Sequence, residues 1–298
     1  MTRFGVTRLS MTWFSSKAIA WVVVLLMAVA TFSAEAAVCL DAEPSGSSYL
    51  GFDRNDYPGD ANLKALRQTF AYAGFWLNPP PGAATNNWRG KRRMLQSAGF
   101  GFLVLFNGRL YTELKNTWSA RKLGASDARQ AIASARREGF PSRTILFLDQ
   151  EQGGRMLPEQ KAYIYTWVDG VAAAGFRAGI YCSGMVFEES PGVRVVTADD
   201  IRQHAESRKI EYWVTNDACP PSPGCAFPEP PPPADSGIHF AEVWQFAQSP
   251  KRNDVAAGCP ANYHADGSCY PPGIGLAQRL HVDLDTATSP DPSDGRTH

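Results

Sequence analysis

Short apolar runs of β-forming residues alternate with helix-like segments along most of this chain, and this alternation constrains the fold more than any other feature. It is typical of parallel strands that are joined by crossover helices. In this order the runs predict an α/β fold, a (β/α)8 TIM-type barrel in which irregular connections and disulfide-pinned insertions replace some late helices. The expected strands are Tyr49–Asp53, Gly74–Leu77, Phe100–Phe106, Thr144–Leu148, Arg177–Tyr181, Glu211–Thr215, Ala241–Phe246 and Leu280–Leu284.

Helical periodicity and helix-end signals support the segments between these strands. Residues 62–73 repeat apolar side chains at helical spacing, and Pro158 begins a helix that ends before Gly175. Ser126 is expected to cap a helix that runs to Glu138. A barrel of this kind takes about 250 residues, so one domain accounts for the length.

The amino-terminal segment has the features of a secretory signal peptide. Arg3, Arg8 and Lys17 precede the apolar run Ala18–Phe32, and an Ala-x-Ala pattern ends at Ala36. An uncleaved membrane anchor is the alternative, although an apolar run of about 15 residues is shorter than the roughly 20 that span a bilayer. We therefore expect a secreted or periplasmic protein with no stable membrane span after cleavage.

Composition divides the chain into four parts. These are a signal peptide at 1–36, an N-terminal lead-in at 37–48, the barrel domain at 49–288 and a disordered tail at 289–298. Two insertions follow late strands, at 219–233 and 249–275. The first is too rich in proline to form regular helix or central strand.

All six cysteines follow the predicted cleavage site, and an even number in an exported chain indicates disulfides. Proximity suggests Cys219 with Cys225 and Cys259 with Cys269, which leaves Cys39 for Cys182; other pairings stay open. A bonded Cys182 would not act as a nucleophile. Zinc is the competing interpretation, but the CxxC spacing and nearby histidines of zinc sites are missing, so no metal is expected.

Charge and motifs exclude several functions. The chain has 29 Lys+Arg and 29 Asp+Glu, and loss of the leader's three basic residues and one acidic residue leaves a net charge of −2. A nucleic-acid partner is usually marked by a basic excess, so none is expected. The histidines show no metal spacing, and no Gly-x-Ser-x-Gly turn or phosphate-binding glycine loop is present. We expect no cofactor, and a monomer.

Asp149 and Glu151 end the central apolar run Thr144–Leu148 and are spaced two residues apart. On a strand, alternate side chains point to the same face, so both carboxyl groups would project together from the strand's carboxyl end. Ligands of α/β barrels bind at that end. Two close carboxyl groups do not both ionise readily, so one can keep its proton as a general acid while the other stays charged. This combination is typical of glycosidic bond cleavage.

Five strand ends carry motifs that together resemble a known family. The motifs are Gly51-Phe52-Asp53, Phe147-Leu148-Asp149-Gln150-Glu151, Ala178-Gly179-Ile180-Tyr181, Trp244-Gln245-Phe246 and Val282-Asp283-Leu284-Asp285. In this order they resemble glycoside hydrolase family 25 lysozymes and, more closely, the DUF1906 group of Rv2525c-like, glycoside-hydrolase-like domains of exported bacterial proteins. The likeness spans residues 49–287.

The resemblance implies a barrel that hydrolyses the glycan of peptidoglycan or another polysaccharide. Glu151 would be the proton donor to the leaving oxygen, and Asp149 would stabilise positive charge or orient the N-acetyl group. Asp53 and Asp283 would shape the surroundings of Glu151 and bind sugar hydroxyls. Asp285 lies on the same strand face as Asp283 and can take its role instead.

The chain departs from the lysozymes directly after Asp53, where it has Arg54-Asn55-Asp56, and in the long connection before the last strand. A cation beside the carboxyl groups would neutralise them. The alternative function is therefore a non-catalytic glycan-binding or cell-wall-maintenance module on the same barrel. A scaffold that uses the proline-rich run Pro228–Pro233 is a third interpretation.

Candidate sugar-binding residues lie at or near strand ends. Pyranose C–H faces pack on aromatic rings while their hydroxyls bond to polar groups. Trp76 and Trp213 have suitable positions, although aromatic side chains also fill barrel cores. The candidates chosen are Asn107, Tyr181, Asn216, Trp244 and Gln245.

Overall fold

The computed structural model describes residues 48–218, 229–248, 269–271, 273–275 and 278–297. The predicted signal peptide at 1–36 lies outside these residues, as does the lead-in apart from Ser48. Among the described helices, none combines the length and hydrophobicity that crossing a bilayer requires.

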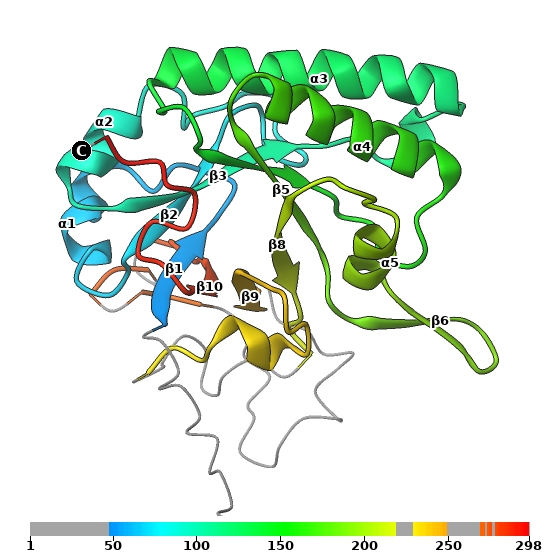
Figure 1. Cartoon of the computed structure of the whole chain (residues 1–298). Coiled ribbons are helices and arrows are strands. Elements are labelled where there is room, and N and C mark those ends of the chain that lie inside the picture. The colour runs from blue at the N-terminus through cyan, green and yellow to red at the C-terminus, as the bar shows by residue number, and fades with distance from the viewer. Residues whose placement is uncertain (1–47, 219–228, 249–268, 272, 276–277, 298) are drawn as a thin grey trace, which may run out of the picture. The chain divides into compact units, whose positions relative to one another are not determined.

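Eight strands close into a barrel (Figure 1). Seven of them follow the predicted apolar runs, whereas the last begins at Asp283, three residues later than predicted. The order around the barrel is β1-β10-β9-β8-β5-β4-β3-β2. The central strands β2, β3 and β4 are buried almost throughout, as expected of strands covered on both faces. The barrel strands are β1 (Tyr49–Asp53), β2 (Tyr72–Trp76), β3 (Gly101–Asn107), β4 (Ile145–Asp149), β5 (Arg177–Ser183), β8 (Ile210–Thr215), β9 (Val243–Ala247) and β10 (Asp283–Ala287).

The last strand corrects the predicted all-parallel barrel. β10 runs antiparallel to both of its neighbours, β1 and β9, whereas the other seven strands are parallel. A parallel eighth strand would need a crossover to the opposite end of the barrel. The described part of the β9–β10 connection contains no helix, and the chain re-enters at the end where β9 leaves. The fold is thus a closed, mixed eight-stranded α/β barrel.

Two long helices lie side by side against the barrel (Figure 1). α3 (Thr117–Glu138) begins nine residues before the predicted cap Ser126, because the side chain of Asn116 accepts a hydrogen bond from Ser119 N at 2.9 Å. α4 (Pro158–Ala173) starts at the predicted proline. The two helices approach closely at Gly124, where a Cβ would lie 2.5 Å from Tyr163 O.

Shorter elements complete the described structure. The helices are α1 (Leu63–Leu66), α2 (Arg92–Ser97) and α5 (Thr197–Gln203), with single 3-10 turns η1 (Asp60–Asn62), η2 (Tyr111–Glu113) and η3 (Pro233–Ser236). A separate hairpin, β6 (Val186–Ser190) and β7 (Val193–Val196), extends beyond the barrel between β5 and α5 (Figure 1). The sequence did not predict this hairpin, because most of its side chains are exposed and it lacks a buried apolar run.

Within residues 289–297 the chain hydrogen-bonds to the barrel, where we predicted a disordered tail at 289–298. Ser293 lies where β3 and β4 diverge: its hydroxyl oxygen accepts from Val104 N at 2.8 Å, its carbonyl oxygen accepts from Ile145 N at 2.8 Å, and its amide donates to Phe102 O at 2.9 Å. Asp291 adds a bond from Phe102 N at 2.7 Å. This segment closes the amino-terminal end of the β3–β4 ladder.

The cysteine predictions are corrected where they can be compared with the structure. Cys182 and Cys269 are free, buried thiols, so the expected bridges to Cys39 and Cys259 are not formed. Burial raises the pKa of Cys182 well above its ordinary value, which excludes an activated thiolate. The pair Cys219 and Cys225 lies outside the described residues.

Replacing Ser293 by alanine is expected to destabilise the protein by about 1–3 kcal/mol, because the buried Val104 N–H loses its acceptor. Urea unfolding would measure the change. Ser142→Ala is the matched control, since Ser142 is exposed on the surface next to the same strand and should shift stability by less than about 0.5 kcal/mol. Equal effects of both variants would contradict a structural role for Ser293.

Candidate functional site

Carboxyl groups from three strands meet at one mouth of the barrel. β1 ends at Asp53 and β4 ends at Asp149, whereas β10 begins at Asp283 because its direction is reversed. The register pairs Asp283 directly with Asp53. They border a cavity of about 80 Å³, which is lined by Asp53, Asn55, Trp76, Leu105, Asp149, Glu151, Tyr181, Trp213, Gln245, Gln248 and Asp283.

Asp53 is buried and held by a chain of side-chain hydrogen bonds. Gln245 Nε2 donates to Asp53 Oδ2 at 2.7 Å. The Oε1 atom of the same amide accepts from Tyr181 Oη and from Gln248 Nε2, both at 2.7 Å, which fixes its orientation. Burial raises the pKa of Asp53 to about 6, while the bonds from Gln245 and Asp285 oppose that rise. Asp53 is therefore mostly ionised at neutral pH.

Asp149 has a different environment. It is 4 % exposed, and neither carboxyl oxygen has a hydrogen-bond partner among the residues described. Burial, followed by the negative charges of Glu151 and Asp53, raises its pKa well above the ordinary value. The raised pKa favours the protonated form of Asp149. A buried polar group without a partner is costly, and such groups are typical of functional sites.

Glu151 lies at the rim of the same cavity. β4 ends at Asp149, but Gln150 N still donates to Tyr181 O at 2.9 Å, so the ladder continues for one more residue. This continuation places Asp149 and Glu151 on the same side, as their spacing predicts. Partial burial raises the pKa of Glu151. The effect is weaker than on Asp149, because the Glu151 side chain is exposed to solvent.

Asp285 lies one inward-facing position deeper than Asp283 on β10. It is fully buried, and its Oδ1 accepts from Trp213 Nε1 at 3.0 Å. Burial and the charge of Asp53 raise its pKa well above the ordinary value. Asp285 in turn lowers the pKa of Asp53 and so favours the ionised form of that carboxyl group. Asp285 thus supports Asp53 from below instead of replacing Asp283 at the cavity wall.

Arg54 does not line the cavity, contrary to the expectation that it could neutralise the site. Its carbonyl oxygen accepts from Trp76 Nε1 at 3.1 Å. Burial lowers the pKa of its guanidinium, and the charges of Asp56 and Asp283 oppose that shift. The guanidinium therefore interacts electrostatically with Asp56 and with Asp283, which lines the cavity, whereas no basic side chain lines the described cavity itself.

Only some of the five predicted sugar-binding residues line the cavity. Tyr181 and Gln245 line the cavity, but the other three do not. Asn107 Nδ2 donates to Pro79 O at 2.9 Å, Asn216 Nδ2 donates to Ser236 O at 2.9 Å, and Trp244 Nε1 donates to Asn216 O at 3.1 Å. Neighbouring residues on β9 face opposite sides, so an inward Gln245 requires an outward Trp244.

Gln248 is a polar cavity residue that sequence reasoning missed; Asn55 and Leu105 also line the cavity and were not candidates. Gln248 lies three residues after Gln245, just past the end of β9, and Nε2 also approaches Tyr181 Oη and Thr215 Oγ1, both at 3.3 Å. The only signal was its position directly after a strand, where loops carry functional groups. Trp76 and Trp213 were considered either as sugar contacts or as core residues. Each is buried and also borders the cavity.

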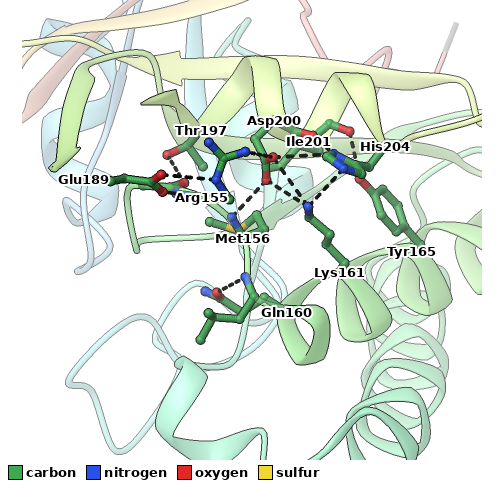
Figure 2. Close-up of polar contacts among 12 residues, drawn as sticks. Arg155, Met156, Gln160, Lys161, Tyr165, Glu189, Thr197, Asp200, Ile201 and His204 are labelled. Carbon is green, nitrogen blue, oxygen red and sulfur yellow. Dashed lines mark hydrogen bonds and ion pairs between the residues drawn. The ribbon is translucent and has the colours of Figure 1, made fainter. Parts of the chain in front are cut away.

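The loop that carries Glu151 is fixed from its far side by the buried carboxylate of Asp200 on α5 (Figure 2). Asp200 Oδ2 accepts from Met156 N at 2.9 Å and pairs with Lys161 Nζ at 3.4 Å. Glu189 on the β6–β7 hairpin binds both the amide and the guanidinium of Arg155 at 3.1 Å. We call this set, with Thr197 Oγ1 donating to Gly154 O at 3.0 Å, the Asp200 clamp.

The hairpin also contacts the loop directly. The ring of Phe187 packs against Gly153, and any side chain at position 153 would collide with it. Gln152 Oε1 accepts from Tyr111 N at 2.7 Å, so the loop is held on that side as well. The backbone on the carboxyl side of Glu151 is therefore anchored by several elements while its own side chain faces the cavity.

Metal chemistry has no candidate ligands here: in the described part of the chain, no three His, Cys, Asp or Glu side chains are placed to hold an ion.

One protein-family model matches part of the chain. Residues 84–222 match the Rv2525c-like, glycoside hydrolase-like domain, a match that includes Asp149, Glu151 and Tyr181. This confirms the resemblance seen in the sequence for that part of the chain. No curated protein sequence matches the chain.

Several solved structures are similar to this chain. An uncharacterized protein of B. stearothermophilus is 18% identical, with 80% of this chain and 95% of that chain covered and a TM-score of 0.49. The Tat-secreted protein Rv2525c of Mycobacterium tuberculosis is 14% identical, with 83% and 97% covered and a TM-score of 0.47. A bacterial lysozyme of Streptomyces coelicolor is 14% identical, with 83% and 94% covered and a TM-score of 0.46.

Asp53→Asn is expected to change how stability depends on pH. Between about pH 4 and pH 6 the folded protein holds a proton on Asp53 that the unfolded chain releases, so stability falls as pH rises through this window. The variant lacks this loss and should be about 1–3 kcal/mol more stable than the wild type at pH 7, with little difference near pH 4. Urea unfolding at both pH values tests it. Asp235→Asn, at an exposed acid, should leave the pH dependence unchanged.

Asp200→Ala is expected to release the Glu151 loop. The buried Met156 N–H loses its acceptor, at a cost of about 1–3 kcal/mol. Hydrogen exchange measured by NMR should show faster exchange at Met156, and at Gly153 and Gly154 if the clamp acts as a unit. Asp199→Ala is the neighbouring control, since Asp199 forms none of the clamp contacts. Unchanged exchange in Asp200→Ala would show that the loop is held without the clamp.

Proposed function

We propose that this chain, which carries an Rv2525c-like, glycoside hydrolase-like domain, is an exported enzyme that hydrolyses a glycosidic bond in cell-wall glycan. The observation that carries the proposal is the meeting of three carboxyl groups in different environments at one cavity. Asp53 is buried and hydrogen-bonded, Asp149 is buried without a partner, and Glu151 is at the rim. Environments that separate the pKa values of neighbouring carboxyl groups create distinct acid and base roles.

Glu151 is the proposed proton donor. Its side chain is the accessible one of the three, and its raised pKa keeps part of the population protonated. It would protonate the glycosidic oxygen as the bond to the sugar C1 breaks, and a water molecule would supply the hydroxyl group that C1 gains. The carboxylate left on Glu151 can accept the proton that the water releases.

Asp53 and Asp149 would act on the reacting sugar in different ways. Ionised Asp53, fixed by Gln245, stabilises the positive charge that develops on the sugar ring. Protonated Asp149 has an unused donor and suits the second of its two expected roles, a hydrogen bond that orients the N-acetyl group. Asp283 and Tyr181 border the same space and are proposed contacts for sugar hydroxyls.

Export is part of the proposal and rests on residues 1–36, whose sequence has the charge, apolar run and small-residue pattern of a signal peptide. A bacterial cell-wall glycan lies outside the cytoplasmic membrane, so the predicted destination and the proposed substrate agree. We further propose that the mature protein acts as a monomer without a cofactor.

Glu151→Gln should lower the rate of glycan hydrolysis by about 10²–10⁴-fold, because the amide cannot donate a proton to the leaving oxygen. Reducing ends released from purified peptidoglycan measure the rate. Glu159→Gln, on the first turn of α4 and outside the cavity, should keep full activity. Equal activity of Glu151→Gln and the wild type would remove Glu151 from the mechanism. Binding of peptidoglycan fragments with no hydrolysis by the wild type would favour the non-catalytic glycan-binding module instead.

A further inference from the structure

A second and larger cavity adjoins the carboxyl cavity. It has a volume of about 400 Å³ and is formed by the segment after β2, the segment after β3 and the side of α3. Glu151 borders both cavities, and the two share no other residue. We call the larger one the proline groove, because Pro79, Pro80 and Pro81 form one of its walls.

The walls of the proline groove are tied to each other. Asn78 Nδ2 donates to Asn107 O at 3.0 Å, and Asn107 N donates to Asn78 Oδ1 at 2.8 Å. Asn107 Nδ2 bonds to Pro79 O at 2.9 Å. Asn55, which lines the carboxyl cavity, donates to Pro81 O at 3.2 Å and joins the two spaces. The groove is thus a preformed feature and not a gap between free loops.

The floor of the groove carries a fixed charge arrangement. Asp127 is buried and accepts from Arg109 Nε at 2.8 Å, from Arg109 Nη2 at 3.1 Å and from Tyr163 Oη at 3.0 Å. Glu113 pairs with the same guanidinium at 3.0 Å. One arginine therefore faces two carboxylates, and the remaining negative charge disfavours an anionic ligand. Prolines and the half-exposed Leu110 add apolar surface, which suits the C–H face of an uncharged sugar.

We propose that the proline groove binds the sugar that leaves during hydrolysis, and that this sugar is uncharged. The inference rests on the proposed function. A proton donor must reach the oxygen between two sugars, so the two sugars lie on opposite sides of it. Asp53 and Asp149, which would serve the reacting sugar, line the carboxyl cavity but not the proline groove, and Glu151 is the one residue that borders both.

The sizes of the two spaces agree with this assignment. A volume of about 80 Å³ holds only two or three water molecules at roughly 30 Å³ each, so the reacting sugar inserts one edge and covers the mouth. The groove, at about 400 Å³, lies within the usual range of roughly 300–1,000 Å³ for ligand pockets. The glycan would therefore run from the mouth of the barrel across Glu151 toward α3.

The test fills the groove without touching the carboxyl groups. Ala83→Trp places an indole at the groove wall, and Ala84→Trp places the same indole on the exposed neighbouring residue, which does not line the groove. Two substrates share the reacting sugars: a soluble peptidoglycan tetrasaccharide and an aryl glycoside of the corresponding disaccharide, whose leaving group is a nitrophenol. Thermal unfolding confirms that both variants are folded.

Ala83→Trp should lower kcat/KM for the tetrasaccharide by about tenfold or more, since the leaving disaccharide loses its site. The same variant should change kcat/KM for the aryl glycoside by less than about threefold, and Ala84→Trp should match the wild type on both substrates. Equal losses on the two substrates, or no loss on either, would overturn the assignment of the groove.

Calorimetry separates this inference from the proposed hydrolysis. The tetrasaccharide is titrated into Glu151→Gln and into the double variant Glu151→Gln/Ala83→Trp. A tenfold or greater loss of tetrasaccharide affinity in the double variant, with unchanged affinity for the disaccharide, supports the groove. This holds even if the wild type hydrolyses neither substrate, because absence of hydrolysis would reject the enzymatic proposal alone. Equal tetrasaccharide affinity in both proteins would reject the groove.

Discussion

The antiparallel pairing of β10 with β1 and β9 is the constraint on which the rest of this structure depends. It closes the sheet, and it also decides which end of β10 reaches the mouth of the barrel. In an all-parallel barrel the last strand would bring its carboxyl end there. Here the amino end arrives instead, so Asp283 lies opposite Asp53 and Asp285 lies beneath it in a fully buried position.

The carboxyl groups at the mouth of the barrel are chemically alike, but their pKa values differ because their surroundings differ. Asp53 accepts a hydrogen bond from the amide of Gln245, whose own oxygen is held by Tyr181 and Gln248. Asp53 is mostly ionised near neutral pH. Asp149 receives no such donor, and its raised pKa favours the protonated form. α5, the β6–β7 hairpin and the η2 turn hold the backbone beyond Glu151. The Glu151 side chain itself lies at the boundary of two cavities. One barrel end thereby combines an anion, a neutral acid and an accessible acid.

Apolar runs predicted the barrel strands well, because strands covered on both faces need nearly continuous apolar sequence. The direction of β10 could not be predicted from its apolar run, because the connection to the preceding strand sets the direction of a strand. The alternation of side chains along a strand correctly predicted that Asp149 and Glu151 lie on the same side. The same rule makes Trp244 point outward once Gln245 points inward. The predicted bridges of Cys182 and Cys269 were wrong for a related reason: pairing depends on the approach of two cysteines in space, which sequence proximity does not determine. The exposed β6–β7 hairpin had no apolar signal to detect.

The position of β10 along the chain gives it a particular importance during biosynthesis. β10 starts at Asp283, after the other seven barrel strands, and Ser293 completes the β3–β4 ladder after it. A polypeptide that emerges amino end first therefore presents two unpaired sheet edges, on β1 and β9, until β10 is made. A chain that is truncated before β10 keeps these open strand edges, which favour aggregation.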